Sequence, residues 1–333
     1  MNTTRRIFRR ISPRRAGVTA AASGALALTA ALALAGPAGA STVASGGYQF
    51  RTVDNHKDVT FNQLLGVNNE GVIAGYFGSG AQGHPNQGYL LQHGYFTSEN
   101  FPGSVQTQVT GLNDRGVTVG FWSSMNNASQ VNDNRGFYAA GGRFHTVDFP
   151  TGDNASPIVD QLLGVNDHDV AVGFYTNGQG SNRGYTYDIR THQFSRVLVP
   201  GAPAGQAGPS LTAAGINNRG DVTGFYAASS TKTDAFLRLS SGRFVTLAVP
   251  GAAMTQALGV NDSDEVVGVY TVGSGNSAQM HGFTWRPGYG FRTVDDPHGI
   301  GATTINGVND EGVLVGFYTD AAGHTDGMIA LPH

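Results

Sequence analysis

The chain has 333 residues and a formal net charge of −3, and only 13% of its residues are charged. It has no cysteine, so disulfides, cysteine nucleophiles and thiolate metal sites are excluded. A charge-poor and slightly acidic chain also argues against nucleic acid or an anionic membrane as its partner.

Residues 1–40 have the pattern of a signal peptide. Six arginines precede an alanine- and leucine-rich run from about residue 16 to residue 35, and Ala38-Gly39-Ala40 forms a small-residue cleavage site. Loss of this segment takes the formal net charge from −3 to −9. Thr4-Arg5-Arg6-Ile7-Phe8 is similar to a twin-arginine signal, and an ordinary secretory signal is the alternative. We expect a mature protein of residues 41–333 without a membrane span, secreted to the extracellular space, or to the periplasm if the source has an outer membrane.

The rest of the chain is organised by a segment that occurs six times. Each copy reads Gly-apolar-Asn-(Asn/Asp)-x-(Gly/Asp)-x-x-x-Gly, and the copies begin at Gly66, Gly111, Gly164, Gly215, Gly259 and Gly307. The Asn pair before the middle Gly is tight-turn chemistry, so each copy predicts a hairpin of two strands, A and B. A period of 44 to 53 residues with about four strand-length apolar runs is typical of a propeller blade.

A second hairpin, of strands C and D, follows each copy. In 136–149, for example, a Gly141-Gly142 turn separates two runs rich in aromatic and β-branched residues. The last copy has no strand D, because the chain ends after strand C at 327–332, but residues 48–54 match the strand D at 290–295. We therefore predict a single all-β domain over 41–333, a six-bladed β-propeller with four strands per blade, whose last blade is closed by the N-terminal strand. The last Gly of each copy (Gly75, Gly120, Gly173, Gly224, Gly268 and Gly316) would allow strands or blades to approach closely.

The sequence resembles the HAF-repeat extracellular proteins, whose repeats carry a His-Ala-Phe after a Gly-x-Asn-(Asp/Asn)-x-Gly-x-x-x-Gly segment. The first half of that motif is matched in all six copies. In the second half Asp234-Ala235-Phe236 and His281-Gly282-Phe283 are near matches, and the other four copies depart from it. The resemblance covers roughly the whole mature chain and implies an exported repeat protein without a defined activity.

The D–A and B–C connections are long and variable, and in a propeller they leave on one face, where we expect any site. The start of strand A lies at this face. Three residues before each repeat glycine stand Gln63, Gln108, Gln161, Thr212, Gln256 and Thr304. The next position is apolar in every copy, so strand alternation would point the first set into the channel and the second between blades. A ring of amides and hydroxyls suits sugars or other polyols; alternatively, it only solvates the channel or bonds to neighbouring backbone.

Other candidate groups lie in the same loops. The histidines there lack the spacing of a zinc site; they are His56, His84, His281, His298 and His324. Two carboxylates of Asp148, Asp153, Asp160, Asp295 and Asp296 could act as acid and base in glycoside cleavage, or they only solvate the loops. Asp167-His168-Asp169 and Asp262-Ser263-Asp264-Glu265 are faintly similar to calcium loops but align with the plain turn of other copies. We expect no metal and no cofactor.

These features together predict an exported, non-catalytic binding or scaffold module, which we expect to be a monomer. The favoured ligand is a carbohydrate or a cell-envelope polymer at the face of the D–A and B–C loops, and a protein partner is the other candidate. The alternative is a secreted propeller-type glycoside hydrolase or polysaccharide lyase that uses loop carboxylates or histidines around the central channel.

Overall fold

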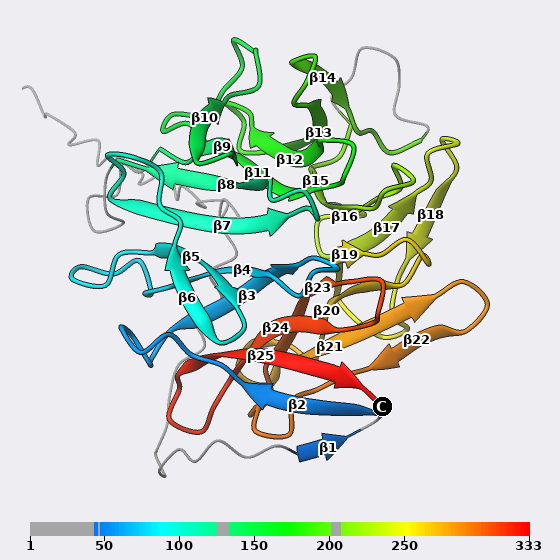
Figure 1. Cartoon of the computed structure of the whole chain (residues 1–333). Coiled ribbons are helices and arrows are strands. Elements are labelled where there is room, and N and C mark those ends of the chain that lie inside the picture. Colours follow the sequence, from blue (N-terminus) through cyan, green and yellow to red (C-terminus); the bar gives the residue numbers. More distant parts are fainter. Residues whose placement is uncertain (1–42, 46, 125–132, 201–207) are drawn as a thin grey trace, which may run out of the picture.

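A computed structural model of the chain (Figure 1) describes residues 43–45, 47–124, 133–200 and 208–333. The predicted signal peptide and its cleavage site lie outside the described residues. In the part of the chain that the structure describes, no helix has the length and apolar character needed to span a membrane.

The strands of the first three repeats follow the turn chemistry of the sequence. The first repeat forms β3 (Asn62–Val67), β4 (Ile73–Phe77), β5 (Gln87–Gln92) and β6 (Tyr95–Ser98). The second forms β7 (Gln106–Leu112), β8 (Thr118–Ser123), β9 (Arg135–Ala140) and β10 (Arg143–Val147). The third forms β11 (Asp160–Val165), β12 (Val170–Thr176), β13 (Asn182–Asp188) and β14 (Gln193–Arg196).

The same order recurs in the second half of the chain. The fourth repeat forms β15 (Leu211–Ile216), β16 (Val222–Ala227), β17 (Thr233–Arg238) and β18 (Phe244–Leu247). The fifth forms β19 (Met254–Val260), β20 (Val266–Val272), β21 (Gln279–Arg286) and β22 (Gly290–Thr293), with a 3-10 turn at Gly275–Ser277. The last forms β23 (Thr303–Val308), β24 (Leu314–Thr319) and β25 (Thr325–Pro332).

The N-terminal strand completes the sheet of the last repeat. Strand β2 (Tyr48–Thr52) pairs antiparallel with β25, with Tyr48 opposite Pro332 and Thr52 opposite Met328. The two strands lie side by side next to the C-terminus (Figure 1). This is the closure that the missing strand D predicted. A further strand, β1 (Val43–Ser45), pairs with the outer edge of β2, so this sheet has five strands rather than four.

The predicted all-β, propeller-like fold is confirmed, but the prediction of six separate four-stranded sheets is wrong. The described strands form five sheets, and four of these hold a single repeat each. The fourth and fifth repeats share one eight-stranded sheet, because a parallel bridge joins Thr233 of β17 to Met254 of β19. Parallel bridges of the same kind join other repeats only as isolated pairs, such as Asn134 with Val159 and Met280 with Ala302.

The core lies between neighbouring repeats. The apolar residues of strand A just before the repeat glycine are completely buried in every repeat; they are Leu64, Val109, Leu162, Ala213, Ala257 and Ile305. One cluster joins Val119 and Tyr138 of the second repeat to Leu162 and Tyr185 of the third. The faces of successive sheets therefore hold each other in place, as expected from the strand alternation.

The last glycine of each repeat segment is required by a close approach inside the repeat. A Cβ atom on Gly224 would lie 2.0 Å from the Thr212 carbonyl oxygen and 2.9 Å from the Phe236 ring. The five equivalent glycines have the matching strand A carbonyl oxygen at 1.9 to 2.4 Å. No side chain fits at that distance from a backbone atom, so only glycine lets strand B pair with strand A at this register shift.

Candidate functional site

The first glycine of each repeat segment lies around the central axis, and we call these six residues the glycine ring. A Cβ on any of them would lie 3.0 to 3.4 Å from the Cα of the glycine in the next repeat. The backbones of the six repeats therefore lie in close contact here. A cavity of about 80 Å³ is lined by this ring and by its neighbours in strand A, such as Leu65, Thr110 and Asn306.

Two positions beyond the glycines, six asparagines link the repeats into a closed circle. They form the asparagine ring, which consists of Asn68, Asn113, Asn166, Asn217, Asn261 and Asn309. Each side-chain Nδ2 donates to the main-chain carbonyl of the asparagine in the next repeat at 2.9 to 3.2 Å, and Asn309 donates to Asn68. Each Oδ1 accepts an N–H of its own A–B turn at 2.8 to 3.0 Å. Each asparagine side chain thus holds its own turn through its oxygen and contacts the next repeat through its nitrogen.

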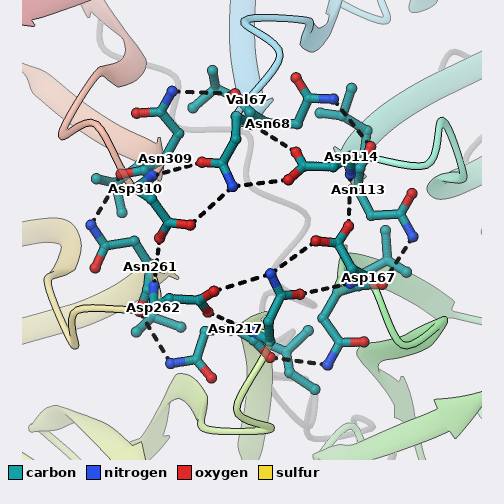
Figure 2. Close-up of a pocket in the computed structure, with 18 residues that line it drawn as sticks. Val67, Asn68, Asn113, Asp114, Asp167, Asn217, Asn261, Asp262, Asn309 and Asp310 are labelled. Atoms are coloured by element: carbon teal, nitrogen blue, oxygen red, sulfur yellow. Dashed lines mark hydrogen bonds between the residues drawn. The ribbon is translucent and has the colours of Figure 1, made fainter.

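The next residue of each turn makes a second circle, which we call the turn ring. It consists of Asn69, Asp114, Asp167, Asn218, Asp262 and Asp310. Each Oδ1 accepts the main-chain N–H of the equivalent residue in the preceding repeat at 2.7 to 2.9 Å. Figure 2 shows the four aspartates of this ring converging around the open centre of a cavity, which has a volume of about 90 Å³.

The turn ring combines four carboxylates with two amides, and the amides are saturated as donors. Asn69 Nδ2 donates to Asp114 Oδ2 and Asp310 Oδ2, both at 2.9 Å. Asn218 Nδ2 donates to Asp167 Oδ2 at 2.9 Å and to Asp262 Oδ2 at 3.1 Å. Each amide therefore sits between two carboxylates and uses both of its N–H groups. The groups of this ring that can still form hydrogen bonds to a ligand are the carboxylate oxygens, which act only as acceptors.

Negative charge extends from the turn ring over the surrounding turns. The six A–B turns (68–71, 113–116, 166–169, 217–221, 261–265 and 309–312) hold ten aspartates and glutamates and two arginines. Both arginines pair with aspartates of these turns, since Arg115 contacts Asp169 and Arg219 contacts Asp221 and Asp264. Ten acidic and two basic residues give these turns a formal net charge of −8, and one of the acidic residues, Glu265, pairs with Arg286 of β21 at 2.6 Å.

The structure brings the six predicted ligand-binding residues to one level of the strands but buries most of them. Gln63, Gln161, Thr212 and Thr304 are at most 3% exposed, and Gln108 and Gln256 are partly exposed. Each is paired across the hairpin with a residue of strand B, such as Tyr76 for Gln63 and Phe174 for Gln161. Residues paired in this way have side chains on the same face of the sheet. Their role in ligand binding stays a prediction, which the burial of four of the six side chains does not favour.

Hydrogen bonds show what the buried amides and hydroxyls do instead. Gln63 Oε1 accepts from the Tyr76 hydroxyl at 2.8 Å. Gln108 Nε2 donates to Asn86 Oδ1 at 2.9 Å, and Thr212 Oγ1 accepts from Asn182 at 3.0 Å. Gln161 Nε2 is buried and has no hydrogen-bond partner among the described atoms. The hydrogen-bond partners of Gln63, Gln108 and Thr212 come from strand B or from the B–C segment. This agrees better with the alternative that these residues bond to neighbouring parts of the protein than with ligand binding.

The loop histidines mostly pair with aspartates. His84, His281, His298 and His324 each lie 2.7 to 3.5 Å from a carboxylate oxygen, of Asp58, Asp295, Asp296 and Asp320 respectively. Among the described residues, only one of these pairs belongs to a larger group of converging metal-ligand atoms, formed by Asp320, His324 and Asp326. The sequence analysis missed it because the spacing D-x-x-x-H-x-D is not a familiar zinc signature.

Three carboxyl groups near the loop face are protonated more readily than usual. Burial raises the pKa of Asp160 to about 7, and that of Asp54 to about 6. Burial and the neighbouring charges of Asp54 and Asp320 raise the pKa of Asp326 to about 7. Of the other loop carboxylates, Asp148 pairs with Arg135 at 2.7 Å and Asp153 is exposed.

The turn ring was not among the residues that the sequence singled out. Two of its members, Asp167 and Asp262, were noted only as weak calcium-loop similarities. The signal that could have found it is the recurrence of Asn or Asp at one position of all six turns. In a closed ring, one position repeated six times must form one circle around the axis.

No family model matches the chain, and no curated protein matches it. Several solved structures share a similar arrangement of strands. A gluconolactonase from Xanthomonas campestris is 9% identical with a TM-score of 0.47, and the match covers 86% of this chain and 90% of that one. A virginiamycin B lyase from Staphylococcus aureus is 10% identical with a TM-score of 0.43, over 85% of this chain and 99% of that one. A six-bladed propeller lectin from Aleuria aurantia is 9% identical with a TM-score of 0.42, over 70% and 78%. At such values none of these proteins assigns its ligand or its chemistry to this chain.

Proposed function

We propose that this chain is an exported, non-catalytic binding module whose site is the mouth formed by the turn ring, and that its ligand is a cationic group of a basic protein segment. The observation that carries the proposal is the donor and acceptor balance of the ring. Its two amides are used up, and four carboxylates remain as acceptors around one small cavity. A lysine ammonium or an arginine guanidinium offers only donors and a positive charge, so it complements this ring.

The size and rigidity of the mouth favour a side-chain head group over a larger ligand. A cavity of about 90 Å³ has room for only a few water molecules, so the head group of one side chain is of a size to enter it. The ring is held by backbone donors from all six repeats, so little conformational entropy is lost when a ligand binds. The acidic turns around it attract a basic partner over a distance set by the ionic strength.

The same two rings support a finer description of the fold. Each of them takes one residue from each repeat and closes on itself. We infer that the six repeats are six blades of one propeller, and that the eight-stranded sheet is two blades linked at one edge. Similarity to the HAF-repeat proteins and export from the cell remain part of this proposal; the repeat segments support the first and the sequence of residues 1–40 supports the second.

A second candidate is the glycoside hydrolase or polysaccharide lyase predicted as the alternative. One observation favours it: burial and the charge of Asp54 raise the pKa of Asp326 to about 7, and burial raises the pKa of Asp54 itself to about 6. Such pairs can supply an acid and a base near neutral pH. A carbohydrate ligand without cleavage would have to bind on the same loop face, where the predicted amide ring is largely buried.

The test is a thermal-shift screen with n-butylammonium, methylguanidinium, a hexalysine peptide and a panel of polysaccharides. We expect hexalysine to raise the melting temperature of the protein, and the simple cations to do so at higher concentration. The variant Asp114→Asn with Asp262→Asn should lose this shift. The control Glu70→Gln with Glu311→Gln removes the same charge from the same face outside the ring and should keep most of it.

Each outcome of the screen separates the candidates. Equal loss in both double variants would mean that the ring geometry plays no part, and no shift with any cation would exclude the proposal. A shift with a glycan alone would favour the carbohydrate hypothesis. Cleavage products in the same mixture, lost in Asp326→Asn, would favour the enzyme.

A further inference from the structure

The loop between β24 and β25 brings three metal-ligand atoms together at the opposite end of the strands from the turn ring. Asp320, His324 and Asp326 each offer one such atom, and all three atoms lie within 4.8 Å of one another. His324 Nδ1 is 3.5 Å from Asp320 Oδ2. Two ligands bonded to one tetrahedral ion at about 2.1 Å lie roughly 3.4 Å apart. The pair is thus already at the separation that a shared ion needs.

The loop is held in this shape without a ligand. Asp320 Oδ1 accepts the main-chain N–H groups of Ala322 and His324, both at 2.8 Å. The main chain closes the same turn through Asp320 and His324 at 3.1 Å, with Gly323 at a φ of +83°. Because Asp320 uses one oxygen to fix the turn, its other oxygen is directed at His324. The imidazole is therefore placed by the loop and not by chance side-chain packing.

A separate segment brings a further carboxylate to the same place. Asp54 follows β2, and its Oδ1 accepts the main-chain N–H of Gly327 at 3.0 Å, next to Asp326. Asp326 is only 7% exposed. Among the residues that the structure describes, no lysine or arginine forms an ion pair with Asp54, Asp320 or Asp326. Three carboxylates that lie near one another with a single imidazole as their basic neighbour are unfavourable unless a proton or a metal cation neutralises them.

We propose that Asp320, His324 and Asp326 bind one divalent transition-metal ion of the Zn²⁺ or Mn²⁺ class, with Asp54 as a further oxygen ligand or as a partner of the ligands. A mixed set of carboxylates and one imidazole suits these ions. Calcium prefers six to eight oxygen ligands, which this loop does not offer. The ion would join the end of the N-terminal strand to the last hairpin, and so strengthen the closure of the ring.

The test uses the purified protein treated with EDTA and then titrated with ZnCl₂, MnCl₂ or CaCl₂. We expect isothermal titration calorimetry to give one site per chain with Zn²⁺ or Mn²⁺. At about 100 times the dissociation constant the melting temperature should rise by roughly 4 °C for a chain of this size. His324→Ala should abolish both signals, and because His324 is partly exposed this variant should still fold.

The matched control is His84→Ala. His84 is also a loop histidine paired with an aspartate, at 3.2 Å from Asp58, but no third ligand among the described residues joins that pair. The control should bind metal as the unmodified protein does. Absence of binding with Zn²⁺ and Mn²⁺, a shift that survives in His324→Ala, or a response to Ca²⁺ alone would each overturn the proposal.

Discussion

Asp160 gives the sharpest test of the packing between the loops and the strands. It is the first residue of β11 and is 1% exposed. Its Oδ2 accepts the main-chain N–H of Phe149 at 2.6 Å, and its Oδ1 accepts the hydroxyl of Tyr185. Burial outweighs these two hydrogen bonds and raises the pKa of Asp160 from 3.8 to about 7. The carboxyl is therefore protonated in the folded state at pH values where the unfolded chain has already lost the proton.

The sign of the pH dependence follows from that difference. The stabilisation by the bound proton is complete below about pH 4 and is lost as the pH rises through about 7. A shift of about 3 units corresponds to about 4 kcal/mol, because each unit is worth 1.36 kcal/mol. For a chain of this size that amounts to roughly 7 °C in melting temperature. Asp160→Asn removes the titration and keeps the shape, and its amide can accept from Phe149 and donate to the Tyr185 oxygen.

We expect Asp160→Asn to be more stable than the unmodified protein at pH 8, by up to that amount, and to lose its advantage at pH 4.5. The first repeat supports the substitution, since Asn62 stands at the equivalent position and accepts the N–H of Asn55 at 2.8 Å. Thermal unfolding at pH 4.5, 6 and 8 measures the difference. Asp153→Asn, at an exposed position, is the control. A variant difference that does not change with pH would refute the reasoning.

The remaining predictions concern the closure and the glycines. A chain that lacks residues 1–56 should melt well below one that lacks residues 1–40, because β25 loses its partner β2; equal melting temperatures in differential scanning calorimetry would show that the N-terminal strand does not close the ring. Gly224→Val should prevent folding, because its Cβ would lie 2.0 Å from the Thr212 carbonyl oxygen. Gly116→Ala lies in a turn with open space around it, so it should lower the free energy of unfolding by only about 1 to 2 kcal/mol. Circular dichroism measures the folding of both variants. A Gly224→Val protein that folds as well as Gly116→Ala would contradict this reasoning.

Much of the fold could be predicted because each repeat contains recognisable turn residues between runs of strand-forming residues. The Asn-Asn-x-Gly and Asn-Asp-x-Gly turns became the hairpins β3–β4 and β7–β8, and the unmatched strand at residues 48–52 became the partner of β25. The shared sheet of the fourth and fifth repeats could not be predicted. It depends on a single parallel bridge at Thr233 and Met254, and the repeat pattern carries no information about one bridge between neighbouring repeats.

The site was harder to predict than the fold, for two physical reasons. Alternation along strand A indicates which sheet face Gln63 occupies, but not that Tyr76 of the next strand covers it. Turn residues such as Asp114 look like local turn formers, and their role appears only when six turns meet at one axis. The Asp320, His324 and Asp326 group needs the three-dimensional course of its loop, which composition does not contain.

The most direct test of the cationic-ligand site is the dissociation constant of hexalysine, measured by isothermal titration calorimetry at 50 mM and 200 mM NaCl. We expect binding that weakens with salt, as a site of clustered carboxylates requires, and a loss of at least tenfold in Asp114→Asn with Asp262→Asn. The Glu70→Gln and Glu311→Gln control should lose no more than about threefold, in keeping with exposed charges outside the ring. Binding that is independent of salt, or equally weak in both double variants, would contradict a site at the turn ring.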